Sequence, residues 1–216
     1  MTRSRRRLRW IAVLAAATLL LAGVWFYQAY FSSTNAAIRH AEAFLFRRMS
    51  VSQLAEQGKY RFFFATNRER VDSGEKTPLL EQFGATRREQ LTFGSFDATI
   101  QPSLGLGMLI NPTEWLQNEE IKLREVRTLS RQELTDALRS KVEQSPHGAV
   151  LIVLHGFREA YESALRKTAF LGHVLDVDTP VLLFDWPGNQ GSSLRGYRRA
   201  RSVAKDSGAE LAQTLE

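Results

Sequence analysis

The chain of 216 residues contains no cysteine. It can therefore form neither a disulfide nor a thiolate metal site, and it has no thiol nucleophile. The glycine-containing loop at residues 188–192 lacks the lysine of a nucleotide-binding P-loop, and Gly105 and Gly107 lack the third glycine of a dinucleotide-binding motif. The histidines do not have the spacing of metal ligands. We therefore predict no cofactor and no metal site.

Net positive charge is scarce outside the N-terminus, because acidic residues there nearly balance the basic ones. The formal net charge is +6, and five of the basic residues lie within the first nine positions: Arg3, Arg5, Arg6, Arg7 and Arg9. The rest of the chain is close to neutral overall, so the basic isoelectric point reflects a basic flank rather than a nucleic-acid-binding domain. We predict that nucleic acid is not a partner.

An uncharged segment follows the basic flank. Residues 10–31 read WIAVLAAATLLLAGVWFYQAYF, and about 20 apolar residues suffice to cross a bilayer as a helix. By the positive-inside rule, residues 1–9 form a cytoplasmic flank and the C-terminal domain lies outside the cytoplasm. The sequence thus predicts a single-pass cell-membrane protein with a periplasmic or extracellular domain. A cleaved signal peptide is the alternative that stays open.

The remainder divides into a connector and a larger domain. Apolar residues recur at helical spacing within residues 32–59, which predicts a juxtamembrane helical connector. The domain then spans residues 60–216, and its first half contains three predicted strands at residues 60–68, 90–100 and 120–129. Ser130 and Glu133 match a capping box, which predicts that a helix begins there.

The second half of the domain alternates between strands and helices. Residues 149–154 and 179–187 are strongly apolar, as strands covered on both faces are. Helical patterns cover residues 158–175, with Tyr161, Leu165 and Leu171 among the expected buried positions, and residues 197–216. This alternation predicts an α/β fold in which a parallel sheet has flanking helices.

Polar residues gather where the predicted parallel strands end. His155-Gly156-Phe157 follows one strand, and the segment from Asp185 to Ser193 follows the next. Ligands of open parallel sheets bind at the carboxyl ends of the strands. These two segments are therefore the expected location of a functional site.

The domain resembles the α/β-hydrolase superfamily, and more narrowly a poorly characterised bacterial esterase/lipase-like branch. Four motifs carry the resemblance in the same order along the chain. They are FFATNR at residues 63–68, HGF at 155–157 followed by ALR at 164–166, WP at 186–187 and GY at 196–197. The resemblance covers only the N-terminal half of such a catalytic domain.

The resemblance implies an oxyanion loop at residues 155–158. Gly156 and Phe157 are the candidate donors of backbone N–H groups, with Phe157 preferred, because such groups stabilise the negative charge of acyl transfer. His155 is expected to order the loop. The alternative role of general base is disfavoured, because the base of this superfamily comes last in the chain.

No nucleophile is found in the sequence. The elbow motif G-x-S-x-G does not occur, and Gly191-Ser192-Ser193 lacks its spacing. We therefore predict a membrane-anchored protein of serine ester or acyl hydrolase lineage, with an ester or acyl substrate, whose 216-residue chain is itself inactive. The alternative is a non-catalytic membrane-anchored binding protein or a degenerate one. The sequence predicts no oligomeric state.

Overall fold

The computed structural model describes residues 2–27, 49–55, 58–71, 78–100 and 121–216. The chain divides into two units, residues 1–46 and residues 47–216. The first unit contains helix α1 (Thr2–Tyr27), which includes most of the uncharged segment. Among the described residues, no helix combines the length and the apolar character that a membrane crossing requires. The predicted transmembrane helix is therefore not confirmed.

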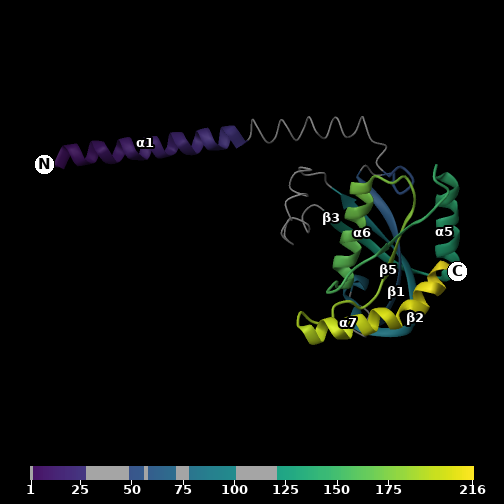
Figure 1. Cartoon of the computed structure of the whole chain (residues 1–216). Coiled ribbons are helices and arrows are strands. Elements are labelled where there is room, and N and C mark those ends of the chain that lie inside the picture. The colour runs from purple at the N-terminus through teal and green to yellow at the C-terminus, as the bar shows by residue number, and fades with distance from the viewer. Residues whose placement is uncertain (1, 28–48, 56–57, 72–77, 101–120) are drawn as a thin grey trace. The chain divides into compact units, whose positions relative to one another are not determined.

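The second unit is built on one five-stranded sheet with the order β3-β2-β1-β5-β4 (Figure 1). Its strands are β1 (Lys59–Arg70), β2 (Phe83–Ile100), β3 (Ile121–Leu129), β4 (Leu151–Leu154) and β5 (Val181–Asp185). Strand β5 pairs in parallel with both β1 and β4, whereas β2 is antiparallel to both of its neighbours.

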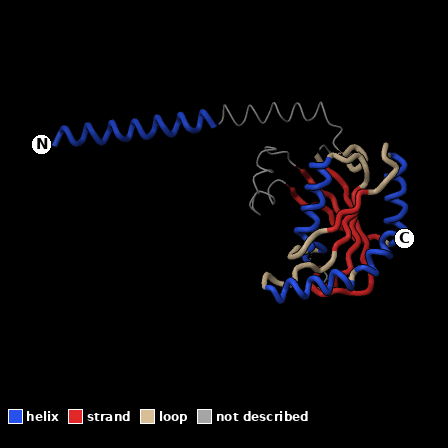
Figure 2. Tube along the Cα trace, in the orientation of Figure 1, coloured by secondary structure: helices blue, strands red, loops and turns tan. Residues whose placement is uncertain are grey.

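The prediction of a parallel sheet is thus wrong for half of the sheet, which is mixed. Strands β1, β2 and β3 follow one another as a meander, and consecutive neighbouring strands without a crossover run antiparallel. Strand β4 is reached through helix α5 (Arg131–Gln144), and β5 through helix α6 (Tyr161–Leu175). The α/β class itself, with helices flanking the sheet, is confirmed (Figure 2).

The consecutive aromatic residues of β1 are explained by burial on both faces of the sheet. Phe62 and Phe64 pack on the face that α6 covers. Phe63 packs on the opposite face against α5, and Ala65 packs there near α7 (Leu194–Asp206) and α8 (Gly208–Leu215). Since side chains alternate along a strand, a strand covered on both sides is apolar at every position.

Several local predictions can be compared with the structure. The capping box is confirmed, because Ser130 Oγ accepts from the Glu133 amide at 3.2 Å and Glu133 accepts from the Ser130 amide at 2.7 Å. The burial predicted for Leu171 is wrong, because its side chain is 38% exposed. The last predicted helix is two helices, α7 and α8, which meet at Ser207.

The connector contains no helix where it is described. Residues 49–55 form turns and an isolated bridge between Gln53 and Tyr60. Met49 and Val51 are buried, and the Val51 amide donates to Asp178 at 2.9 Å. This segment therefore packs as part of the domain. The rest of the predicted connector, apart from residues 58–59, lies outside the described residues.

Candidate functional site

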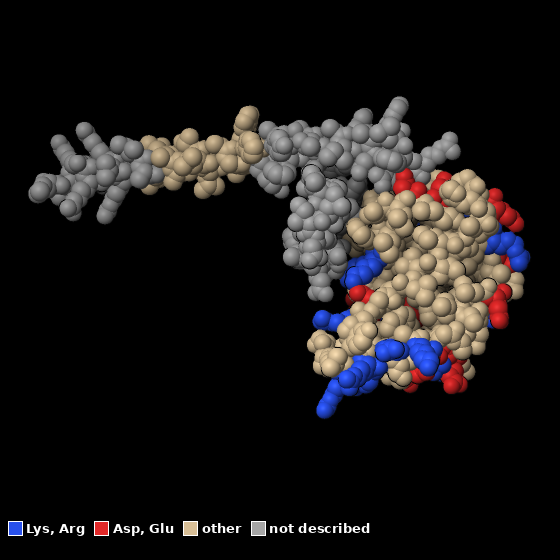
Figure 3. Space-filling model, viewed as in Figure 1, with Lys and Arg blue, Asp and Glu red and all other residues tan. Residues whose placement is uncertain are grey.

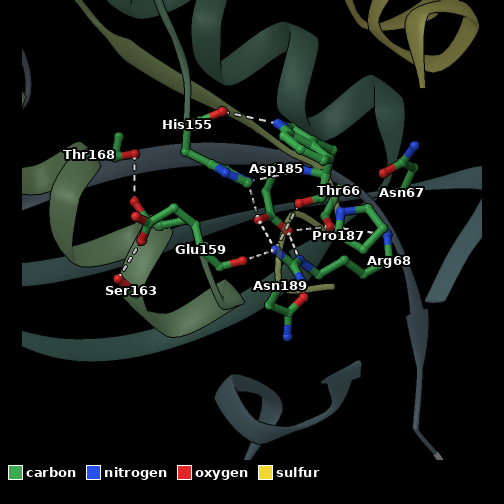
Figure 4. A network of polar contacts seen from close by, with 12 residues as sticks. Thr66, Asn67, Arg68, His155, Glu159, Ser163, Thr168, Asp185, Pro187 and Asn189 are labelled. Carbon is green, nitrogen blue, oxygen red and sulfur yellow. Dashed lines mark hydrogen bonds and ion pairs between the residues drawn. The ribbon is translucent and has the colours of Figure 1, made fainter. Parts of the chain in front are cut away.

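A polar network lies at the carboxyl ends of the three parallel strands (Figure 4). Thr66 of β1 is in register with Asp185, the last residue of β5, and His155 directly follows the last residue of β4. The strands run in the same direction, so these three side chains reach the same edge of the sheet. This is the edge at which the sequence predicted a functional site.

Asp185 is the centre of this network. Its buried carboxylate accepts hydrogen bonds from Thr66 Oγ1 at 2.6 Å, from Arg68 at 2.7 and 3.0 Å, and from His155 Nε2 at 2.9 Å. Burial alone would raise the pKa of Asp185, but the hydrogen bond from His155 and the charge and hydrogen bonds of Arg68 lower it below its ordinary value. Asp185 is therefore ionised at neutral pH.

Arg68 connects this carboxylate to the surrounding loops. Its side chain is fully buried. Nη1 donates to Gly84 O at 3.0 Å and to Asn189 Oδ1 at 2.7 Å. Nη2 donates to Glu159 O at 2.9 Å and to Trp186 O at 2.8 Å. A buried guanidinium requires such partners, so a single side chain fixes the start of β2 and the loops that follow β4 and β5.

His155 is held on both sides of its ring. Nε2 lies 2.9 Å from Asp185 Oδ1 and 3.2 Å from the Trp186 amide, and the ionised carboxylate is the stronger partner, so Nε2 carries a proton. Nδ1 lies 2.9 Å from Gly156 O. The ring stacks on Trp186 with a centroid distance of 5.4 Å, and the side chain is only 3% exposed. The ring is therefore buried, and both of its nitrogens lie close to other atoms of the protein.

The loop after β4 has one turn residue in a rare conformation. Arg158 has a φ of 73°, and its amide donates to Gly188 O at 2.9 Å. The Phe157 ring packs edge-on against Tyr197 of α7, at a centroid distance of 5.4 Å. Within the part of the chain that the structure describes, the amides of Gly156 and Phe157 donate no hydrogen bond.

Two glycines in this region have opposite surroundings. A methyl group at Gly156 would meet no atom within 4 Å, so open space lies in front of this residue. A methyl group at Gly188 would come within 2.9 Å of Gly156 O. The loops after β4 and β5 therefore touch at Gly188, while the other side of Gly156 stays accessible.

Sequence reasoning placed His155, Gly156 and Phe157 at this edge but missed Thr66, Arg68 and Asn189 as parts of one network. The available indication was that two apolar runs of the sequence end at polar residues, Thr66 and Asp185. Ser193 lies outside the network, because its hydroxyl caps α7 by accepting from the Gly196 amide at 3.1 Å. Within the described ranges, no three His, Asp or Glu side chains converge as metal ligands would.

The helix-linked parallel strands and the histidine-glycine loop at their carboxyl edge indicate an α/β-hydrolase-like domain. In agreement, residues 130–216 match the model of a family described as alpha/beta hydrolase of unknown function (DUF900). The matched region runs from α5 to α8 and includes the loop after β4. Neither the curated proteins nor the solved structures gave a match. The α/β-hydrolase superfamily resemblance is thus supported, without assignment to a branch.

Proposed function

We propose that this domain is of serine ester or acyl hydrolase lineage and that Gly156 and Phe157 provide its oxyanion loop. The observation that carries the proposal is the pair of backbone amides at these residues, which have no partner within the described structure. Gly156 is exposed and lies beside open space at the carboxyl edge of the sheet. An acyl oxygen that becomes negatively charged needs donors of this kind, held in place before the reaction.

The buried network supports the proposal by explaining how these amides are kept in position. His155 receives its orientation from Asp185 and Trp186, and Arg68 binds the carbonyl of Glu159 at the far end of the loop. A backbone donor contributes to catalysis only when it needs no reorganisation during the reaction. In this proposal His155, Asp185 and Arg68 are positioning residues, and His155 is not the general base because its side chain is only 3% exposed and Nε2 faces Asp185.

A fluorophosphonate probe, which labels activated serines, tests the proposal. The probe is applied to the 216-residue chain and to the product of the gene read past the codon for Glu216. We expect no labelling of the first chain, because it lacks G-x-S-x-G. We expect labelling of a longer product at the serine of such a motif. A longer reading frame without the motif, or an unlabelled longer product, would count against the proposal.

A second test addresses the loop in an active product. Replacing Phe157 by proline removes the amide N–H, and loss of one oxyanion donor costs roughly 100- to 1000-fold in kcat in known cases. The matched control is Ala160→Pro in the same loop, because Ala160 has a φ of −81° that proline can adopt. Equal activity of the Phe157→Pro variant and the unaltered product would refute the assignment of this donor.

A non-catalytic binding protein is the second candidate. It is favoured by the use of Ser193 as a helix cap and by the lack of an elbow motif. This candidate predicts that a longer product binds acyl esters without turnover. Calorimetry with a short-chain ester, followed by analysis of the recovered ligand, distinguishes binding alone from hydrolysis.

The location of the chain stays a prediction from its N-terminal sequence. The uncharged segment at residues 10–31 after five arginines supports membrane anchoring with the domain outside the cytoplasm. Extraction of membranes with alkaline carbonate tests the anchoring, and N-terminal sequencing of the mature chain tests the cleaved signal peptide. Release of the intact chain by carbonate would contradict the anchor.

A further inference from the structure

Helix α7 carries a concentration of positive charge on its exposed surface. Five exposed basic residues and one acidic residue, Asp206, give the helix a formal charge of +4, whereas residues 10–216 as a whole carry 24 basic and 23 acidic residues, a net charge of +1. Figure 3 shows Lys and Arg side chains gathered along the edge of the domain where Figure 1 places α7. The basic residues are Arg195, Arg198, Arg199, Arg201 and Lys205.

Three of these side chains form a row along the outer face of the helix. Arg198, Arg201 and Lys205 are three and four residues apart, which places them on one side of an α-helix. The opposite side holds Gly196 and Ala200, which are buried. At 1.5 Å per residue, the row is about 10 Å long.

This charge arrangement is unfavourable for the helix itself. Like charges face each other at helical spacing in the pairs Arg195–Arg199, Arg198–Arg201 and Arg201–Lys205, and such pairs destabilise a helix. The first turn has no acidic residue, although acidic residues are the ones that the helix dipole favours there. Among the described residues, no ion pair includes a basic residue of α7.

The other exposed helices do not share this arrangement. Helix α5 has Glu133 in its first turn, and α6 has Glu162 there. In α6, Glu162 also pairs with Arg166 at 2.6 Å. An uncompensated row of charge, where neighbouring helices compensate theirs, indicates an external anionic partner.

Apolar side chains at the start of α7 indicate the kind of partner. Leu194 is 68% exposed and Tyr197 is 49% exposed, next to the basic row. Basic residues beside exposed leucine and tyrosine suit the boundary between lipid headgroups and acyl chains, where both kinds of side chain are stabilised. Duplex nucleic acid would satisfy the charges but would leave these apolar groups in water. The observations therefore favour a lipid surface over a nucleic acid.

We propose that the outer face of α7, defined by Leu194, Arg198, Arg201 and Lys205, docks on an anionic phospholipid surface. Each basic side chain near such a surface contributes about fivefold in affinity. Neutralising the three basic residues of the row is therefore expected to weaken the contact by about 100-fold. The contact is also expected to weaken with salt, because it depends on screened charges.

A single fluorescent label locates the contact in the full chain. Because the chain has no cysteine, Ser202→Cys on α7 and Ser140→Cys on α5 each provide one labelling site. Each labelled chain is mixed with phosphatidylglycerol vesicles that carry a nitroxide quencher on the lipid headgroup. We expect quenching at position 202 and little at position 140. Equal quenching at both positions, or equal quenching by neutral phosphatidylcholine vesicles, would overturn the proposal.

Charge variants test whether vesicle binding depends on the basic residues of α7 or only on the net charge of the chain. In the chain labelled at position 202, Arg198→Gln, Arg201→Gln and Lys205→Gln are combined. The control combines Arg88→Gln, Arg124→Gln and Arg139→Gln, which remove the same charge from exposed positions elsewhere. We expect only the α7 variant to lose quenching, with unchanged circular dichroism. Equal loss in both variants, or tighter binding of the labelled chain to duplex DNA than to vesicles, would refute the proposal.

Discussion

Arg68 and Asp185 are 117 residues apart in the sequence and form an ion pair in which neither side chain is exposed, with 2.7 Å between Nε and Oδ2. The pair links β1 to β5, and through the other hydrogen bonds of Arg68 it reaches the loops that follow β4 and β5. Such a buried ion pair stabilises the fold little more than apolar residues in the same place would. Removal of one partner, however, lowers the free energy of unfolding strongly, because the other charge is left buried and unpaired.

Replacement of Asp185 by asparagine tests that cost. The change keeps the shape of the side chain but leaves the buried Arg68 without its counter-charge. We expect the free energy of unfolding to fall by about 3–5 kcal/mol in urea titrations followed by tryptophan fluorescence. The control is Asp206→Asn on the surface of α7, for which a change within about 0.5 kcal/mol is expected. A loss of less than about 1 kcal/mol for Asp185→Asn would contradict the role of the pair.

The lowered pKa of Asp185 predicts a pH dependence of stability. A carboxyl group whose pKa is lower in the folded state than in the unfolded state stabilises the fold above the unfolded value. That contribution is lost as the pH falls from the ordinary value of 3.8 through the lower folded value. We therefore expect the stability difference between the wild type and Asp185→Asn to be constant above about pH 5 and to shrink below about pH 4. A difference that grows on acidification would refute this explanation.

The elements of the domain could be predicted from the sequence, but the network could not. The aromatic run at residues 62–64 and the capping box at Ser130 are local patterns, and both have the predicted structure. The contact between Arg68 and Asp185 depends on β5 lying next to β1, which is a property of the strand order. Local patterns do not determine strand order.

The same distinction explains where the sequence predictions were wrong. Strand β2 begins at Phe83 rather than at the predicted residue 90, because Phe83 pairs with Arg70 of β1 across the sheet. Leu171 has the spacing of a buried residue on α6, yet its side chain is 38% exposed, and spacing alone does not show how far the covering elements extend. Contacts with residues distant in the sequence determine both the start of β2 and the exposure of Leu171.

Two glycine-to-alanine substitutions should have opposite effects. At Gly94 in β2, a methyl group would come within 2.2 Å of the Phe64 ring and 2.4 Å of Arg127 O, and the backbone oxygen cannot move away. We expect Gly94→Ala to destabilise the domain by at least about 1–3 kcal/mol. Gly156→Ala should stay within about 0.5 kcal/mol, because nothing occupies the space. Thermal unfolding of both variants measures the contrast, and equal losses would show that the loop is packed differently.

The role of His155 in ordering its loop can be measured by amide hydrogen exchange. The Arg158 amide is protected by its hydrogen bond to Gly188 O, on the loop that His155 joins to Asp185. We expect His155→Ala to speed the exchange of this amide by about tenfold or more, which corresponds to about 1.4 kcal/mol of local opening. The exposed His147 provides the control substitution, His147→Ala. An unchanged exchange rate in His155→Ala would show that the loop is held without the histidine.

Strand β4 predicts a specific route to aggregation. Among the described strands it pairs only with β5, and the Leu151 amide donates to Pro180 O on that side. Backbone groups alternate in direction along a strand, so those of Ile152 and Leu154 face the open edge. Leu154 is also 53% exposed. An open apolar edge pairs readily with other chains, and a lysine there opposes such pairing.

We therefore expect Leu154→Lys to slow the growth of light scattering in concentrated solutions of the chain. The matched control is Leu175→Lys at the end of α6, where the leucine is 55% exposed but lies on no strand. If apolar exposure alone caused aggregation, the two substitutions would act equally, because they remove leucines of nearly the same exposure. A larger effect at residue 154 would identify the backbone edge as the cause. An equal effect would assign the aggregation to surface apolarity in general.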